Sequence, residues 1–152
     1  MTPTKILLKT TLGNITIELR EDMPITSGNF EKLVKEGFYN GIIFHRVIDG
    51  FMIQGGDPRG NGTGGPGYTI EDEFMPDNKN NKGTIAMANA GPNTGGSQFF
   101  INLVNNNYLD KAHPAFGTVV EGFEVVEKIG KVKTNWNDKP LEDVVITEAV
   151  VL

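Results

Sequence analysis

The side chains that could do chemistry are few, and most familiar catalytic arrangements are missing. His45 and His113 are the only histidines, lie far apart in the sequence, and form no H-E-x-x-H motif, so a zinc site is not expected. The absence of cysteine excludes a thiolate nucleophile and a cysteine-based metal site. Ser97, His113 and an aspartate could be drafted into a hydrolase triad, but Ser97 lies in GGSQFF and not in a G-x-S-x-G elbow. Because such triples arise by chance among many polar residues, we do not favour hydrolysis.

Arg46 is an unexpected charge within FHRVIDGFMIQGGD, a stretch that otherwise has the pattern of two strands joined by an Asp-Gly hairpin turn. Strand alternation predicts that Arg46 lies beside Phe44 and Ile48, and that Gln54 lies beside Met52 on the second strand. An arginine among apolar neighbours is unfavourable unless its head group is paired or solvated. Arg46 is therefore either a surface residue whose head group reaches water or a functional residue.

The stretch SQFFINL has an aromatic ring on each face if it forms a strand. Alternation puts Phe99 and Ile101 on one face, and Gln98, Phe100 and Asn102 on the other. If Phe99 and Ile101 fill the interior, Phe100 is a large apolar group on the outer face, flanked by amide side chains. An apolar floor with a few hydrogen-bonding groups is typical of a binding groove. The alternative is that a helix or loop covers Phe100.

A glycine-rich loop follows the predicted hairpin. The stretch GGDPRGNGTGGPG (55–67) holds seven of the nineteen glycines, and Gly60, Gly62 and Gly65 match G-x-G-x-x-G. A dinucleotide site needs a helix directly after this motif, whereas Pro-Gly and a strand-like YTIEDEF follow here. We expect a loop that bends sharply or comes close to something bound, with an ordinary flexible connection as the alternative.

The elements that must position these residues are mainly strands, because β-branched and aromatic runs alternate with Gly, Pro and Asn. Eight strands are predicted, at 5–11, 15–20, 42–48, 51–55, 83–89, 97–104, 115–121 and 144–151. Two helices are predicted at 24–37 and 121–130, each with one apolar stripe. The expected architecture is a closed eight-stranded antiparallel β-barrel capped by two α-helices, in a single domain spanning 1–152.

Composition excludes several partners. The formal net charge is −5, the pI is about 5.0, and no run of five or six basic residues occurs, so neither nucleic acid nor an anionic membrane is expected as a partner. No stretch has membrane-spanning length, and the N-terminal residues lack a continuous apolar segment followed by a cleavage site. These features favour a soluble, cytoplasmic protein, which we expect to be a monomer.

Four long blocks carry a family resemblance. FHRVIDGFMIQGGD, GNGTGG, MANAGPNTGGSQFFI and YLDKAHPAFGTVVEG resemble, in order, the signature blocks of the cyclophilins, a family of peptidyl-prolyl cis/trans isomerases. The likeness runs from about residue 5 to the end of the chain. It implies a capped eight-stranded barrel with a proline-binding groove on its outer surface, in agreement with the strand and helix count. It also implies isomerase activity on X-Pro bonds, without a cofactor or metal.

The resemblance assigns roles by position. Arg46 matches the catalytic arginine of the family, and we expect Gln54 to assist it. The apolar pocket for the substrate proline is matched by Phe51, Met52, Phe100, Leu109 and His113. The groove that holds the peptide backbone is matched by Gln54, Ala88, Asn89 and Gln98. On this basis His113 is interpreted as a pocket wall and not a general base, and His45 as a structural neighbour.

Tyr108 is the clearest departure from the family pattern, because many members carry tryptophan at this position. In the family that tryptophan donates a hydrogen bond to the immunosuppressant cyclosporin, so Tyr108, which we count among the substrate-binding residues, implies weaker cyclosporin binding and remains compatible with isomerase chemistry. Three functions are weighed. The chain could be an isomerase that acts on flexible or unfolded chains, a proline-peptide binding or chaperone module whose catalysis is incidental, or a structural scaffold. A scaffold has no use for Arg46, Gln54, Gln98 and Phe100 together, whereas the sequence does not separate the first two functions.

Overall fold

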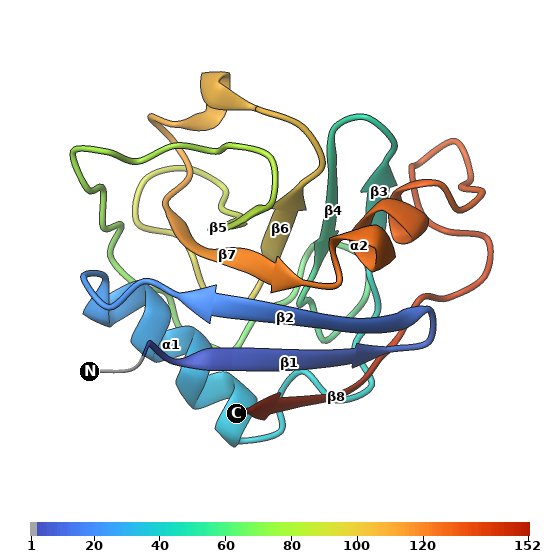
Figure 1. Cartoon of the computed structure of the whole chain (residues 1–152), viewed down its shortest axis with the longest axis horizontal. Helices are drawn as coiled ribbons and strands as arrows, with labels where there is room; N and C mark the ends of the chain where they lie inside the picture. The colour runs from blue at the N-terminus through green and yellow to red at the C-terminus, as the bar shows by residue number, and fades with distance from the viewer. Residues whose placement is uncertain (1–2) are drawn as a thin grey trace.

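The structure, a computed structural model, describes residues 3–152 and is built around one eight-stranded antiparallel sheet (Figure 1). The strands are β1 (Lys5–Thr10), β2 (Gly13–Leu19), β3 (Arg46–Ile48), β4 (Met52–Gly55), β5 (Thr84–Met87), β6 (Phe99–Asn102), β7 (Ala115–Glu121) and β8 (Ile146–Val151). Their order across the sheet is β3-β4-β6-β5-β7-β2-β1-β8. The prediction of a mainly β protein with eight antiparallel strands is confirmed.

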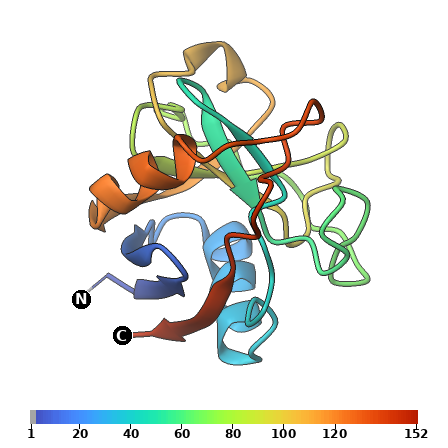
Figure 2. The same ribbon diagram turned by 90° about the vertical axis from the view of Figure 1, so that its right-hand side faces the viewer.

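The sheet curls strongly around its interior, as the two perpendicular views show (Figures 1 and 2), but it does not close through a continuous strand ladder. Within residues 3–152, the edge strands β3 and β8 are not paired with each other. The segment before β3 is joined instead to the start of β8 and the residues before it, because the Phe44 N–H donates to the Val144 carbonyl at 2.9 Å and the Ile146 N–H donates to the Ile42 carbonyl at 2.8 Å. The expected closed barrel is thus an open, curled sheet with a short backbone link between its edges.

The interior of the curl is filled by a large apolar cluster with an aromatic centre. Phe30 lies 5.1 Å from Tyr39, 5.6 Å from Phe99 and 5.2 Å from Phe116 between ring centroids. Phe44 meets Phe99 edge to face at 6.1 Å. All five rings are fully buried. Burial of each ring contributes on the order of 1.5–3 kcal/mol, so this cluster is a principal source of stability for the sheet that carries the site.

Two α-helices pack on the sheet, as predicted. The first, α1 (Pro24–Lys35), packs against β7 and β8, and the second, α2 (Phe123–Gly130), packs against β2, β3 and β4. Proline begins α1, and the Glu73 carboxylate accepts hydrogen bonds from the N–H groups of Ile25 and Thr26, at 3.1 and 2.6 Å. A negative side chain at this end also offsets the helix dipole. Neither α-helix in the described residues has the length and hydrophobicity needed to cross a bilayer.

Some local details differ from what the sequence patterns suggested. The strand predicted at 42–48 begins only at Arg46, so alternation does not extend back to Phe44. Phe44 lies in the interior cluster, whereas Arg46 is exposed and shares the outer face with Ile48. The strand-like segment YTIEDEF forms only an isolated bridge, between Ile70 and Gly95. A short 3-10 helix, η1 (Asn107–Leu109), was not predicted and bears on the site described next.

Candidate functional site

A second, smaller apolar cluster lies on the outer face of the sheet. It is formed by Met52, Ala86, Phe100 and Ala115, with Ile48, Phe51, Ala88 and Leu109 packed against it. The cluster exists because β6 alternates: Phe99 and Ile101 enter the interior, and Phe100 between them points outward. The predicted outward position of Phe100 is therefore correct. The ring is only 4% exposed, because the residues around η1 flank it, yet it still forms the floor of an open pocket.

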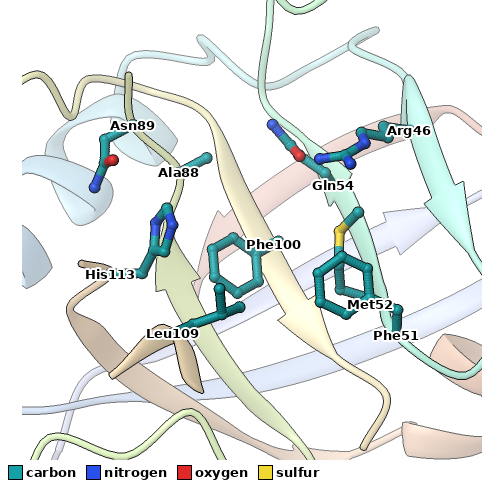
Figure 3. Close-up of a pocket in the computed structure, with 9 residues that line it drawn as sticks. All are labelled: Arg46, Phe51, Met52, Gln54, Ala88, Asn89, Phe100, Leu109 and His113. Atoms are coloured by element: carbon teal, nitrogen blue, oxygen red, sulfur yellow. The ribbon is translucent and has the colours of Figure 1, made fainter. Parts of the chain in front are cut away.

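The pocket has a volume of about 240 Å³. It is lined by Arg46, Phe51, Met52, Gln54, Ala88, Asn89, Phe100, Leu109 and His113 (Figure 3). Figure 3 shows the Phe100 ring at the centre, with Arg46 and Gln54 at one rim and His113 on the other side. All nine of these residues were assigned to the site from the sequence, so segments from residue 46 to residue 113 converge as the resemblance implied.

His113 is held as a rigid wall of the pocket. Its ring meets Phe100 edge to face, with centroids 5.3 Å apart and planes at 84°. Its Nδ1 lies 3.0 Å from the Met87 carbonyl oxygen. Because a carbonyl oxygen only accepts, Nδ1 carries the proton and donates this hydrogen bond, which fixes the ring orientation. His113 thus presents an oriented ring to the pocket.

Arg46 is the only charged side chain that lines the pocket. It stands at the start of β3, directly opposite Gln54 on β4. Within residues 3–152 it takes part in no ion pair and no side-chain hydrogen bond. The Gln54 amide donates to the Gln98 side-chain oxygen at 3.1 Å, and no side-chain hydrogen bond joins Gln54 to Arg46 in this part of the chain. The guanidinium donors at the rim therefore face the pocket without a protein acceptor.

A second hollow of about 340 Å³ continues from the pocket. It shares Gln54, Ala88 and Asn89 with the first hollow and adds Gln98 and parts of the glycine-rich loop. The Asn89 side chain is tied down, because its amide donates to the Ala112 carbonyl at 2.7 Å. The backbone N–H and C=O of Asn89 have no hydrogen-bond partner within the described residues. The two hollows adjoin as one groove, and the free backbone groups of Asn89 belong to a residue that lines both.

The glycine-rich loop is bent sharply around one buried carboxylate. Asp57 is 1% exposed, and its oxygens accept from the N–H groups of Arg59 at 2.8 Å, Asn61 at 3.0 Å and Gly62 at 2.5 Å. Burial alone would raise the pKa of Asp57, but these backbone hydrogen bonds outweigh it and hold the pKa below its ordinary value. A side chain at residue 64 would clash with this carboxylate, so close approach explains one glycine.

The loop is connected to the groove through Gln98. Its side-chain amide donates to the carbonyls of Gly62 and Gly64, at 3.1 and 2.9 Å. Gln98 therefore lies in the second hollow and not in the apolar pocket. Tyr108 also lies outside the pocket lining: its ring is 73% exposed and stacks on Phe51, with centroids 6.2 Å apart.

Other polar candidates are not assembled into a site. The Ser97 hydroxyl is buried and donates to the Gly56 carbonyl at 2.7 Å, so it supports the loop. His45 is buried beside the glycine-rich loop, and its Nδ1 has no partner within residues 3–152. No group of three or more His, Asp or Glu side chains in that range could hold a metal ion. Sequence reasoning missed Ala86 and Ala115 in the floor, although Ala86 pairs with Phe100 across β5 and β6.

Comparison with known proteins agrees with this geometry. Residues 5–151 match the model of the family described as "Cyclophilin type peptidyl-prolyl cis-trans isomerase/CLD". The chain is 47% identical to a peptidyl-prolyl cis-trans isomerase-like 1 of Homo sapiens over 152 residues, covering 97% of this chain and 92% of that protein. It is 49% identical to a peptidyl-prolyl cis-trans isomerase of Schizosaccharomyces pombe over 150 residues, covering 95% and 97%.

Two solved structures also resemble this chain. A crystal structure of a Cryptosporidium parvum cyclophilin type peptidyl-prolyl cis-trans isomerase has a TM-score of 0.96 and 34% sequence identity, covering 99% of this chain and 98% of that chain. A crystal structure of the same isomerase in the presence of the dipeptide Ala-Pro has a TM-score of 0.94 and 35% identity, covering 97% and 98%.

Proposed function

This chain belongs to the cyclophilin-type peptidyl-prolyl cis-trans isomerases, and from that membership we propose that its groove accelerates rotation about X-Pro bonds through a hydrogen bond from Arg46 to the prolyl nitrogen. The barrier to rotation, about 18–20 kcal/mol, arises because amide resonance draws the nitrogen lone pair into the C–N bond. In the twisted transition state this lone pair is localised on nitrogen and accepts a hydrogen bond well. The planar ground state accepts one poorly, so a donor at this position stabilises the transition state selectively.

The single observation that carries this proposal is the placement of Arg46. Its guanidinium stands at the rim of an otherwise uncharged pocket, with no protein acceptor within the described residues. Arginine stays charged at any working pH and presents its donors in a rigid planar group. A hydrogen bond of this kind needs no proton transfer, nucleophile or cofactor.

The apolar pocket supplies the grip on the proline ring. Its floor and walls are Met52, Phe100, Leu109 and His113, with Phe51 at one side. A volume of about 240 Å³ is below the range of about 300–1,000 Å³ that accommodates drug-sized ligands, so it suits one small ring. The crystal structure of the Cryptosporidium parvum relative in the presence of Ala-Pro supports the inference that this chain takes a prolyl residue here.

The rest of the groove holds the peptide on one side of the rotating bond. The backbone groups of Asn89, which have no partner within the described residues, and the Gln54 side-chain amide, which uses only one of its two N–H donors, offer hydrogen bonds to an extended peptide. Gln98 supports them by holding Gln54 against the glycine-rich loop. With the proline ring held in the pocket and one side of the X-Pro bond fixed, the other side of that bond is free to rotate. Positioning and electrostatics together would supply about 7 kcal/mol, roughly a 10⁵-fold acceleration.

A second candidate is a proline-peptide binding or chaperone module whose catalysis is incidental. It is favoured by the second hollow, which extends the groove beyond the pocket and offers contacts to residues that flank the proline. The two functions make different demands on Arg46: a binding module does not need it, whereas the isomerase does.

The test is the exchange rate between the cis and trans forms of a short X-Pro peptide, measured by NMR with a catalytic amount of the protein. We expect strong acceleration of an exchange that is slow without a catalyst. If the peptide binds but its exchange rate is unchanged, the binding module replaces the isomerase. If the peptide neither binds nor exchanges faster, the assignment of the groove is wrong.

A further inference from the structure

Beneath η1, buried asparagines connect the opposite walls of the pocket. Asn80 and Asn102 are fully buried, Asn106 is 3% exposed and Asn78 is 9% exposed. Polar side chains are buried at this density only where their hydrogen-bonding groups are paired. Here each of the four amide nitrogens makes two hydrogen bonds, so every amide donor is used.

The hydrogen bonds form an unbroken chain from one wall to the other. Asn106 donates to the Phe51 carbonyl and to Asn102, both at 2.9 Å. Asn102 then donates to Asn80 at 3.1 Å, and Asn80 donates to the His113 carbonyl at 3.0 Å. The end points are the backbones of Phe51 and His113, which line the pocket from the hairpin and from the loop that follows η1.

The His113 end of the chain is held twice. Asn78 donates to the same His113 carbonyl at 3.2 Å and to the Asp110 carbonyl at 2.6 Å, and its own oxygen accepts from the Ala115 N–H at 2.8 Å. The Asp110 carboxylate, directly after η1, accepts from the Asn80 backbone N–H at 2.6 Å. The segment that carries Leu109 and His113 is thereby fixed to the loop before β5.

We propose that Asn78, Asn80, Asn102 and Asn106 are positioning residues that set the width of the proline pocket by holding its two walls at a fixed separation. Asparagine suits this role because its amide both donates and accepts, so a chain of such side chains can continue from wall to wall. A fully satisfied buried network favours one arrangement over its alternatives. The inference rests on the proposed function, since it assumes that this pocket holds the proline ring.

The network includes one residue on the outer face of β6, Asn102, and does not line the pocket itself. Asn102 lies two residues beyond Phe100 on this face and opposite Met52 on β4. None of the four asparagines belongs to the lining of the pocket or of the second hollow. Their effect on substrate must therefore pass through the position of Phe51, Leu109 and His113.

The position of the walls affects the grip on the ring in the ground state and the transition state alike. Loss of the network is therefore expected to weaken peptide affinity while the rate of the bound peptide changes little. This split between affinity and rate is the reverse of that expected for loss of Arg46. A purely structural role would lower the melting temperature and leave both quantities unchanged in the folded protein.

The test compares wild type with Asn106→Ala, Asn78→Ala and the double variant, by peptide Kd and by the exchange rate of bound peptide from NMR line shapes. Asn106→Ala is chosen because it does not leave the Phe51 carbonyl without a partner. This carbonyl keeps a second hydrogen bond, from the Leu103 backbone N–H at 3.0 Å. Each single variant is expected to weaken affinity by about five- to tenfold, the effect of one organising hydrogen bond. The fold-loss of affinity in the double variant should be smaller than the product of the fold-losses in the two single variants, because both side chains act in one network.

The matched control is Asn105→Ala, since Asn105 is the exposed neighbour whose oxygen, among residues 3–152, accepts only from the Lys82 N–H, at 2.8 Å. Its affinity and rate should equal those of wild type. A folded Asn106→Ala protein that binds and exchanges peptide like Asn105→Ala would overturn the proposal, whatever its melting temperature. Failure of wild type itself to bind peptide would instead count against the proposed function.

A measurement on wild type covers the case in which the alanine variants do not fold. The side-chain amide protons of Asn80 and Asn106 should exchange slowly with solvent, and saturation with an X-Pro peptide should slow them further, because a held ring restrains both walls. Unchanged exchange of these side-chain protons on saturation would contradict the proposal. Asn106→Ser, which keeps a hydroxyl donor, should lie between wild type and Asn106→Ala in affinity.

Discussion

Arg46 and Gln54 are directly paired residues of the antiparallel strands β3 and β4, so both side chains stand on the outer face at one rim of the pocket. The Gln54 amide is held by Gln98, which in turn is held by the carbonyls of the glycine-rich loop. This places an anchored amide next to an unanchored guanidinium. We propose that Gln54 restricts the positions that Arg46 can occupy when substrate is present.

Replacement of Gln54 should therefore reduce the rate more than it reduces affinity. In Gln54→Ala the guanidinium keeps its charge but loses a neighbour that limits its motion. We expect kcat to fall by about tenfold, which is less than the roughly 10²-fold effect of a full 1 Å misplacement, because the guanidinium can still reach its position. The cis-trans exchange rate of the peptide, measured by NMR at one temperature and at saturating peptide concentration, gives this rate. An unchanged kcat in a folded Gln54→Ala protein would show that Gln54 serves only in binding.

His113 should behave as a wall and not as a base. His113→Phe retains an aromatic ring against Phe100 but loses the hydrogen bond to the Met87 carbonyl. We expect kcat/KM to fall by less than tenfold, against the roughly 10²–10⁴-fold contribution of a general base. A loss of 10²-fold or more in kcat/KM for a folded His113→Phe protein would refute this role.

Tyr108 should limit the affinity for cyclosporin. The ring is exposed on top of Phe51, at the position where the family resemblance places a tryptophan that donates a hydrogen bond to the inhibitor. We expect Tyr108→Trp to bind cyclosporin about tenfold more tightly, the effect of one added hydrogen bond. Calorimetric titration measures the change. Trp136→Tyr is the matched control, because Trp136 is 92% exposed and lines neither hollow. Equal affinities in Tyr108→Trp and wild type would exclude this explanation.

His45 should make stability fall as the solution becomes mildly acidic. Burial lowers the pKa of His45, and the negative charge of Asp57 partly offsets this effect. The positive charges of Arg46 and Lys139 lower the pKa further. Because the folded pKa lies below the unfolded value of about 6.5, the unfolded chain binds a proton more readily. The contribution of neutral His45 to stability is therefore fully present above about pH 6.5. It is lost as the pH falls from there through the lower pKa of the folded state.

The measurement is the melting temperature of wild type and of His45→Phe across this pH range. The variant keeps a flat ring of similar size and cannot titrate, so its melting temperature should depend less on pH than that of wild type. Parallel curves for the two proteins would mean that His45 does not contribute to the acid sensitivity.

Much of the scaffold follows from local patterns. Alternation in SQFFINL correctly separated Phe99 and Ile101, which lie inside, from Phe100, which lies outside, because these residues lie in a regular strand. The same rule failed for Phe44, since the strand begins only at Arg46 and the chain before it follows no period of two. Barrel closure was also not predictable, because pairing between the edge strands depends on the curl of the whole sheet.

The site was less accessible to local reasoning. Strand alternation could suggest an outer groove near Phe100, but the convergence of Arg46, Asn89 and His113 depends on sheet order and came only from the family resemblance. The asparagine network escaped notice because Asn78, Asn80 and Asn106 look like ordinary loop residues in sequence, and strand alternation placed Asn102 on the outer face without showing its partners. Their burial arises from the way the segment around η1 folds over the end of β6.

The central claim is tested most directly by comparing wild type, Arg46→Lys and Arg46→Ala for the cis-trans exchange rate of a bound X-Pro peptide and for peptide Kd. If Arg46 donates to the prolyl nitrogen in the transition state, Arg46→Ala should lower the rate by about 10²–10³-fold with Kd nearly unchanged, as for other donors that act only in the transition state. Arg46→Lys should recover only part of the rate, because an ammonium group lacks the planar set of donors. Wild-type exchange rates in Arg46→Ala, or equal losses of rate and affinity, would contradict the claim.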